Sequence, residues 1–271
     1  MPASVAIVGI LNVTPDSFYD GGRYLRLEGA LEQGLKLCAE GADWIDVGGE
    51  STRPGSIPVP LAVELDRVLP VIEQLGKRTE VPISVDTRRA RVAEEALKHG
   101  ASRVNAVTGL RDPELASLCA RYGAGLVLNH IRGEPRSMQD APSYGDVVRE
   151  VREELLAQAD QARAAGVPRE RIWLDPGLGF GKDPLAHNLP LIARLGEIAE
   201  TGHPILVGPS RKRFLGELTG APPEDRLAGT LAAVTACVLA GASAVRVHDV
   251  RAARDAVRVA ESIRDARGGR G

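Results

Sequence analysis

The chain has 271 residues, of which 44% are hydrophobic and 26% charged, enough to bury the core of one large α/β domain without disulfide or metal staples. Its 34 basic and 36 acidic residues are interspersed and leave a net charge of −2, which argues against a nucleic-acid partner. No apolar run reaches the roughly 18 residues of a membrane span, and residues 1–15 lack a signal-peptide pattern, so we expect a cytoplasmic protein without a membrane partner.

Short β-branched runs alternate with longer amphipathic segments along the whole chain. The alternation predicts strands over 5–13, 43–48, 82–87, 103–107, 125–130, 172–176, 204–210 and 244–250. It predicts helices over 28–40, 60–77, 89–99, 112–121, 146–165, 184–200, 225–240 and 251–266.

Eight βα units in strict alternation predict one (β/α)8 TIM barrel with its active site at the C-terminal ends of the strands. An open doubly wound sheet is the alternative. We assign residues 1–266 to this single domain. The glycine- and arginine-rich residues 267–271 are predicted to form a disordered tail.

Every predicted strand carries a polar side chain at or near its carboxyl end. These are Asn12, Asp46, Asp86, Asn105, Asn129 with His130, Asp175, Ser210, and Arg246 with His248. A single Asp or Asn at a strand end is more commonly a helix cap or a turn residue. Because all eight strands share the feature and barrel strands converge at their carboxyl ends, we predict a polar site at the mouth.

The residue types at the mouth favour binding over nucleophilic or zinc chemistry. The chain has no HxH or HExxH spacing, no GxSxG elbow, no CxxC pair and no GxxxxGK[ST] loop, although GLGFGK at 177–182 resembles the last superficially. Carboxylates and amides at fixed strand ends suit a flat, nitrogen-rich heterocycle, since an Asp can accept two parallel N–H bonds.

The last two strands predict an anion site. PSRKR (209–213) and RVHDV (246–250) place several basic residues in one sector, and barrels commonly bind phosphate after strands 7 and 8. Arg246 and His248 alternate on one strand, which predicts that they point the same way. A solvated basic face is the alternative for Arg211 and Arg213.

Two loops rich in Gly, Pro, Ser and Thr follow the first two strands, over 12–22 and 48–56. Plain surface loops are the usual explanation for such composition. These loops also carry side chains suited to a lid that excludes water: Asp16, Phe18, Thr52 and Arg53.

Six motifs in chain order resemble those of the dihydropteroate synthase family: NVTPDSF, GGESTRPG, ISVDT, LDPGLGFGK, GPSRK and RVHDV. The resemblance implies a (β/α)8 barrel that joins 6-hydroxymethyl-7,8-dihydropterin pyrophosphate to p-aminobenzoate and releases pyrophosphate. It also implies a Mg²⁺ cofactor and a homodimer.

The resemblance also implies roles for individual residues. Asp86, Asn105 and Asp175 would hold the pterin edge, with Lys212 beside the ring. Arg246 would cover the pterin face and, with His248, contact the pyrophosphate, on which Asn12 would ligate Mg²⁺. The neighbours of p-aminobenzoate would be Thr52, Pro54, Phe180, Ser210 and Lys212. The two loops that cover the substrates would contribute Asp16, Phe18 and Arg53, and Asp46 would lie at the border of these loops.

The implied mechanism is dissociative. Mg²⁺ and the basic sector would stabilise the departing pyrophosphate. Asp86 would offset the charge on the pterin methylene cation, and the aniline nitrogen would then attack. Asp86 and Lys212 are therefore the expected catalytic residues.

Two positions depart from the family pattern. Asn105-Ala106 stands where the family usually has Asn-Asp, and Asn129-His130 where it usually has Met-His. Asn105 keeps its place, so we expect the pterin edge to survive, whereas Asn129 makes one wall of the site more polar.

Three other functions stay open. A methyltetrahydrofolate methyltransferase acting with a corrinoid protein would share the pterin carboxylates but lack TPDSF, STRPG and SRK. A Schiff-base aldolase would use Lys182 or Lys212. A catalytically silent pterin-binding homologue is the third, and the retained polar residues argue against it.

Overall fold

The strands form a closed parallel barrel. The computed structural model describes residues 4–14, 23–51, 55–134 and 136–268. The strands pair in the order β6-β5-β4-β3-β2-β1-β8-β7, and a parallel bridge between Leu174 and Ile205 joins the two ends. The strands are β1 (Ala6–Asn12), β2 (Trp44–Gly48), β3 (Ile83–Thr87), β4 (Arg103–Ala106), β5 (Gly125–Asn129), β6 (Ile172–Asp175), β7 (Leu206–Val207) and β8 (Ala244–Val247).

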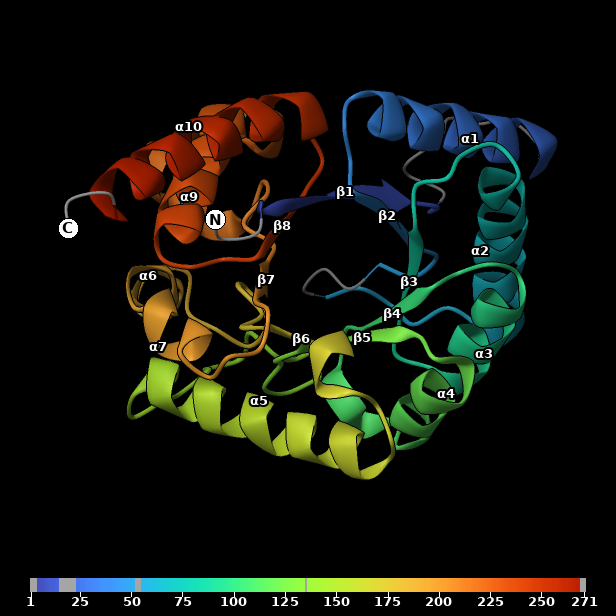
Figure 1. The fold of residues 1–271 in the computed structure, drawn as a ribbon, viewed down its shortest axis with the longest axis horizontal. Coiled ribbons are helices and arrows are strands. Elements are labelled where there is room, and N and C mark those ends of the chain that lie inside the picture. Colours follow the sequence, from blue (N-terminus) through green and yellow to red (C-terminus); the bar gives the residue numbers. More distant parts are fainter. Residues whose placement is uncertain (1–3, 15–22, 52–54, 135, 269–271) are drawn as a thin grey trace.

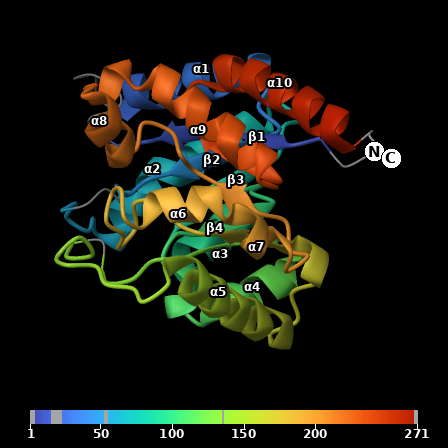
Figure 2. The ribbon, with the colours of Figure 1, turned by 90° about the vertical axis from the view of Figure 1, so that its left-hand side faces the viewer.

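Helices surround the strands as an outer ring (Figure 1). They are α1 (Arg23–Ala39), α2 (Leu61–Gly76), α3 (Ala90–Lys98), α4 (Glu114–Tyr122), α5 (Val147–Ala164), α6 (Asn188–Ala193), α7 (Leu195–Ala199), α8 (Arg213–Thr219), α9 (Leu227–Leu239) and α10 (Val250–Gly268). Single 3-10 turns occur at Gly109–Arg111, Arg169–Arg171 and Pro223–Asp225. The last two helices, α9 and α10, pack side by side (Figure 2).

The predicted barrel and its eight strands are confirmed, with three differences in the helices. The segment predicted as one helix over 184–200 divides into α6 and α7, because Arg194 leaves the helical conformation (φ −108°, ψ 21°). The short helix α8 after β7 was not predicted; barrels often carry an extra helix there. Helix α10 continues through Arg267 to Gly268, whereas 269–271 lie outside the described residues, so the disordered tail stays a prediction.

Side chains of the strands alternate between two cores. Those that face the helices form the large core of the protein, with Ile7, Leu11, Ile45 and Val85 among its buried members. Those that face the barrel axis near the amino ends of the strands form a separate apolar cluster of Val8, Trp44, Val127, Leu206 and Ala244. This second cluster closes the floor of the barrel, so the mouth at the other end is where a ligand can enter.

None of the helices in the described ranges is long and apolar enough to cross a membrane.

Candidate active site at the barrel mouth

Arg246 joins two carboxylates at the centre of the mouth. Its Nε donates to Asp46 at 2.6 Å, and its Nη2 donates to Asp86 at 2.8 Å. Asp46 also accepts a bond from Nδ2 of Asn105 at 3.0 Å. The strand register places Gly48 beside Asp86 and Asp86 beside Asn105. Charge-assisted bonds are strong in such a buried setting, so Arg246 fixes the positions of both carboxylates.

Two oxygen atoms of this cluster lack partners. Oδ1 of Asp86 and Oδ1 of Asn105 are buried and accept no hydrogen bond from the described part of the chain. An unpaired buried acceptor costs about 1–3 kcal/mol, and folded proteins keep few of them. Burial raises the pKa of Asp86, although Arg246 opposes that shift. Two neighbouring free acceptors fit a ligand that presents N–H donors along one edge.

Asp175, at the end of β6, adds a third buried acid. Its Oδ1 accepts a bond from the Gly177 N–H at 2.7 Å. Burial raises the pKa of Asp175 to about 6, against the lowering effects of that N–H, Lys212 and Arg246. Only glycine suits position 177: its φ is +66°, and a Cβ there would lie 1.9 Å from the carbonyl oxygen of His130. The tight turn after β6 therefore presents the Asp175 carboxylate at the mouth.

Lys212 supplies the cation beside these acids. Its Nζ lies 4.2 Å from the centre of the Phe180 ring, within the range of a cation–π contact. Burial lowers the pKa of Lys212 to about 8, with Asp175 and Asp86 pulling it upward. Because about 8 is still above neutral pH, the ammonium stays largely charged at pH 7 and can pair with an anionic ligand.

The predicted basic sector is smaller than the sequence suggested. Arg211 donates from Nη2 to Asp249 at 2.8 Å, and Arg213 donates from Nε to Glu217 at 2.7 Å on the exposed face of α8. Both guanidinium groups are thus paired away from the three acids. Among the described residues, Lys212, Arg246 and, most weakly, Lys182 act on the Asp175 carboxylate.

The contacts of Arg246 and His248 bear on the prediction that their side chains point the same way. Nδ1 of His248 lies 2.9 Å from Oγ of Ser210, whereas Arg246 binds Asp46 and Asp86. The strand β8 ends at Val247, so strand alternation does not reach His248. That the two side chains point the same way therefore stays a prediction.

Asn12 ends β1 beside a gap that a side chain would fill. A Cβ on Gly48 would lie 3.7 Å from Oδ1 of Asn12 and 3.5 Å from Cβ of Asp86. No group of three His, Cys, Asp or Glu residues within the described ranges could hold a metal by itself. Mg²⁺ commonly takes one or two protein oxygens together with substrate phosphates. The amide oxygen of Asn12, beside the room for a Cβ at Gly48, fits that pattern.

A buried lysine, Lys182, lies under the turn that carries Phe180. Its structural role was not predicted from the sequence. Lys182 is fully buried; its Nζ donates to the Phe180 carbonyl at 3.0 Å and lies 2.9 Å from Nδ1 of His130. Nε2 of His130 lies 2.9 Å from Glu154, and burial lowers the pKa of His130 to about 4. Lys182 is thus tied into the scaffold and closed off from the mouth, which argues against a Schiff-base role.

Asn129 makes the wall beside Asp175 polar, as expected, but uses its amide within the scaffold. Asn129 pairs with Asp175 in the strand register and donates from Nδ2 to the Val107 carbonyl at 2.6 Å. It is 3% exposed. The departure from the family pattern therefore ties β5 to the end of β4.

The structure brings most predicted residues to one mouth. Those placed there or at its border are Asn12, Asp46, Asp86, Asn105, Asp175, Phe180, Ser210, Lys212, Arg246 and His248. Five predicted residues on the two early loops lie outside the described residues: Asp16, Phe18, Thr52, Arg53 and Pro54.

The comparison with known protein families matches the part of the chain that contains these motifs. The family model described as "Pterin binding enzyme" matches residues 8–248. A dihydropteroate synthase of Mycobacterium leprae is 49% identical over 265 residues, which cover 95% of this chain and 93% of that protein.

Solved structures agree in fold and in sequence. The dihydropteroate synthase of Xanthomonas albilineans with 4-aminobenzoic acid is 46% identical, with a TM-score of 0.90, over 96% of this chain and 93% of that one. The same enzyme in complex with 7,8-dihydropteroate has a TM-score of 0.86 at 42% identity, over 96% and 94% of the two chains. The chain therefore belongs to the pterin-binding enzymes and, within them, to the dihydropteroate synthases, which are transferases of folate synthesis.

Proposed function

We propose that this chain joins 6-hydroxymethyl-7,8-dihydropterin pyrophosphate to p-aminobenzoate at the barrel mouth, giving 7,8-dihydropteroate and pyrophosphate. The observation that carries the proposal is the pair of unpartnered buried acceptors on Asp86 and Asn105. They lie in a barrel whose solved relatives bind 4-aminobenzoic acid and 7,8-dihydropteroate.

The acids would bind the pterin by its hydrogen-bonding edge. Asp86, Asn105 and Asp175 supply acceptors for the N–H groups of the heterocycle, and each acceptor that a ring N–H satisfies is relieved of its desolvation cost. Lys212 would lie beside the ring. Arg246 would cover the pterin face and contact the pyrophosphate with His248.

The residues support a dissociative reaction. As the bond from the pterin methylene to the pyrophosphate oxygen breaks, the electron pair leaves with the pyrophosphate and the methylene becomes a delocalised cation. The carboxylate of Asp86 would offset that positive charge from a fixed position, which needs no reorganisation at the moment of reaction. Lys212, still charged at neutral pH, would offset the negative charge that builds on the leaving group.

The second substrate would complete the reaction. The aniline nitrogen of p-aminobenzoate would attack the methylene carbon and release its proton. Its expected neighbours are Thr52, Arg53, Pro54, Phe180, Ser210 and Lys212. The Phe180 ring already lies against Lys212, which supports a site where an aromatic ring and a carboxylate could both find a partner.

Asn12 would hold Mg²⁺ together with the substrate pyrophosphate, as the gap beside Gly48 supports. When bound, Mg²⁺ neutralises charge on the pyrophosphate and so makes it a better leaving group.

A homodimer and a cytoplasmic location stay part of the proposal. Two exposed apolar side chains one turn apart on α10, Val259 and Ile263, support a self-association surface.

The test is to follow dihydropteroate formation and pyrophosphate release with Mg²⁺, in the presence and absence of p-aminobenzoate. We expect dihydropteroate with both substrates and slower pyrophosphate release from the pterin substrate alone. An Asp86→Asn variant should lose both signals. The matched control is Asp160→Asn, on the exposed face of α5.

Other outcomes would replace the proposal. Pterin binding with no pyrophosphate release would make the chain a silent homologue. Methyl transfer from methyltetrahydrofolate to a corrinoid protein would make it a methyltransferase instead.

A further inference from the structure

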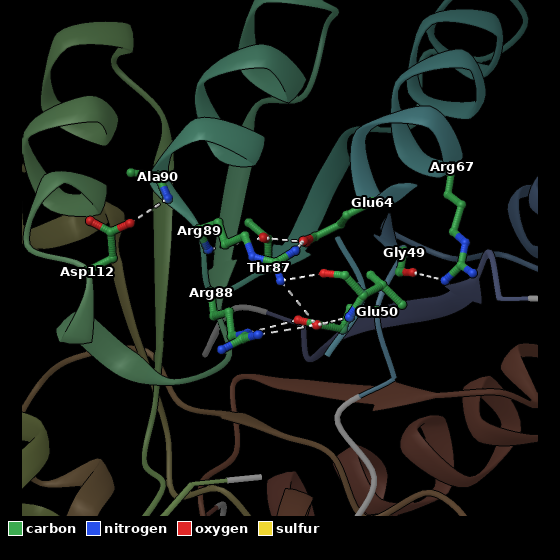
Figure 3. Close-up of polar contacts among 10 residues, drawn as sticks. Gly49, Glu50, Glu64, Arg67, Thr87, Arg88, Arg89, Ala90 and Asp112 are labelled. Atoms are coloured by element: carbon green, nitrogen blue, oxygen red, sulfur yellow. Dashed lines mark hydrogen bonds and ion pairs between the residues drawn. The ribbon is translucent and has the colours of Figure 1, made fainter. Parts of the chain in front are cut away.

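A cluster of charged residues lies behind the mouth, where β2 and β3 end (Figure 3). We call its four members, Glu50, Glu64, Arg88 and Arg89, the loop clamp. Glu50 follows β2, Arg88 and Arg89 follow β3, and Glu64 lies in the first turn of α2. The proposed chemistry uses none of these residues, and the family resemblance assigned them no role.

Glu50 stands at the start of the segment 50–59, which connects β2 to α2. Its Oε1 accepts a bond from the Val59 N–H at 2.9 Å, at the far end of the same segment. Its Oε2 accepts a bond from Nε of Arg88 at 2.9 Å. The Glu50 side chain is only 7% exposed. One carboxylate therefore ties the two ends of the segment to each other and to the end of β3.

Arg89 reaches the same two ends from β3. Its Nη2 donates to the Val59 carbonyl at 2.7 Å and lies 3.4 Å from Oε1 of Glu50. Its Nη1 donates to Glu64. The two arms of one guanidinium thus bridge the end of the segment and the first turn of α2, a geometry that the single ammonium of lysine cannot reproduce.

Glu64 anchors this arrangement. It is fully buried, and its Oε1 accepts a bond from Oγ1 of Thr87 at 2.6 Å. A buried carboxylate without a cation would be strongly destabilising, so Arg89 is needed for the fold as well as for the segment. Just before the segment, the Gly49 carbonyl accepts a bond from Arg67 of α2 at 2.8 Å, and a Cβ on Gly49 would lie 2.7 Å from Cγ1 of Val68.

The clamp is connected directly to the pterin acids. Thr87, Arg88 and Arg89 follow Asp86 without a break in the chain. Any shift of Glu50 or Val59, the two ends of the segment, relative to Asp86 must therefore break a bond of Glu50 or Arg89. The side chains of Glu50 and Arg89 are largely shielded from water, so water cannot easily replace a bond that they lose.

We propose that Arg89 is a positioning residue for p-aminobenzoate: it holds both ends of the segment 50–59 at a fixed place relative to Asp86. The inference rests on the proposed function, in which residues of this segment contact p-aminobenzoate. It adds a residue that touches neither substrate and yet sets the affinity for one of them.

The test is an Arg89→Lys variant, which keeps the positive charge beside Glu64 but loses the second arm. We expect the KM for p-aminobenzoate to rise about tenfold, the effect of one lost charge-assisted bond. The KM for the pterin substrate and the rate of pyrophosphate release without p-aminobenzoate should not change. The matched control is Arg91→Lys on the exposed face of α3, which should leave every parameter unchanged.

A Glu50→Gln variant gives an independent measurement, since its amide keeps the size of the side chain and Arg89 stays to pair with Glu64. It should show the same selective rise. In a double-mutant cycle, the Arg89→Lys and Glu50→Gln effects on the KM for p-aminobenzoate should be less than additive, because both act on Val59.

Two results would overturn the inference while leaving the function intact. One is an equal rise in both KM values, and the other is a loss of thermal stability with no change in either KM; each would give Arg89 a purely structural part. A wild-type chain that forms no dihydropteroate would instead remove the proposed function, and the inference with it.

Discussion

The floor and the mouth of the barrel use the same strands for opposite purposes. At the floor, Trp44 and Trp173 pack edge to face with ring centres 5.3 Å apart, among apolar neighbours. At the mouth, Arg246 bonds to Asp46 and Asp86, and two buried oxygens are left without partners in the described chain. Along β2 the change from Trp44 to Asp46 takes only two residues, one step of strand alternation.

Along the barrel axis, the floor contributes to stability and the mouth to function. The floor is satisfied as it stands: apolar groups contact apolar groups, and Arg103 lies over the Trp44 ring at 4.9 Å. The mouth concentrates desolvated charge that a ligand would stabilise. We therefore expect changes at the floor to affect folding alone and changes at the mouth to affect binding.

Arg246→Met should have the largest effect, because it removes the guanidinium that bonds to the buried carboxylates of Asp46 and Asp86. We expect the free energy of unfolding to fall by about 3–5 kcal/mol, with loss of pterin binding. Chemical denaturation and calorimetry would measure the two effects. Unchanged stability would show that the carboxylates do not depend on Arg246.

Trp44→Ala should match this cost in stability but spare the site. Removing a buried tryptophan side chain, 3% exposed here, should lower the free energy of unfolding by about 3 kcal/mol. Both KM values should stay at their wild-type level at a temperature where the variant is folded. A changed KM for the pterin substrate would mean that floor and mouth are coupled.

Asp175→Asn should have the opposite effects to Trp44→Ala, because it weakens pterin binding and spares stability. It removes a charge-assisted acceptor, so pterin affinity should fall by about 1.5–3 kcal/mol. Isothermal titration calorimetry with the pterin substrate measures this, and unchanged affinity would remove Asp175 from the binding edge.

Stability and pterin affinity should respond to pH with opposite signs. Burial raises the pKa of Asp175 to about 6 from an ordinary 3.8, so the folded chain holds a proton that the unfolded chain has released. This group's contribution to stability is present below about pH 4 and is lost as pH rises through about 6. Pterin affinity, which needs the carboxylate, should instead fall by up to about 1.4 kcal/mol per pH unit below 6. Asp175→Asn should remove this group's share of both dependences and leave the share of Asp86, whose pKa burial also raises. A pH profile that the substitution leaves unchanged would contradict the assignment.

Thr52→Ala should give the smallest effect, about 1 kcal/mol for one neutral hydrogen bond. It should raise the KM for p-aminobenzoate and leave that for the pterin substrate unchanged. Equal changes in both would count against the role predicted for the loop after β2.

The sequence predicted the barrel because its signals are local. Each strand is a short apolar run, and polar residues such as Asp86 and Asp175 mark where strands end. The split at Arg194 was missed because it depends on backbone angles within one amphipathic segment, and α8 because it is only seven residues long.

Side-chain hydrogen bonds between distant strands of the barrel could not be predicted from the sequence. The bonds from Arg246 to Asp46 and Asp86 span 200 and 160 residues, and no periodicity connects such positions. Arg211, by contrast, looked like part of the anion site until the structure paired it with Asp249. Residue types thus identified the site, while the partners within it required the three-dimensional structure.

The most direct test of the account is a crystal structure with the dihydropterin substrate or the pteroate product bound. We predict ring N–H groups within hydrogen-bond distance of Oδ1 of Asp86 and Oδ1 of Asn105, with Arg246 still joined to Asp46. A pterin bound elsewhere, or bound with both oxygens still unpaired, would contradict the claim that the mouth is built for this heterocycle.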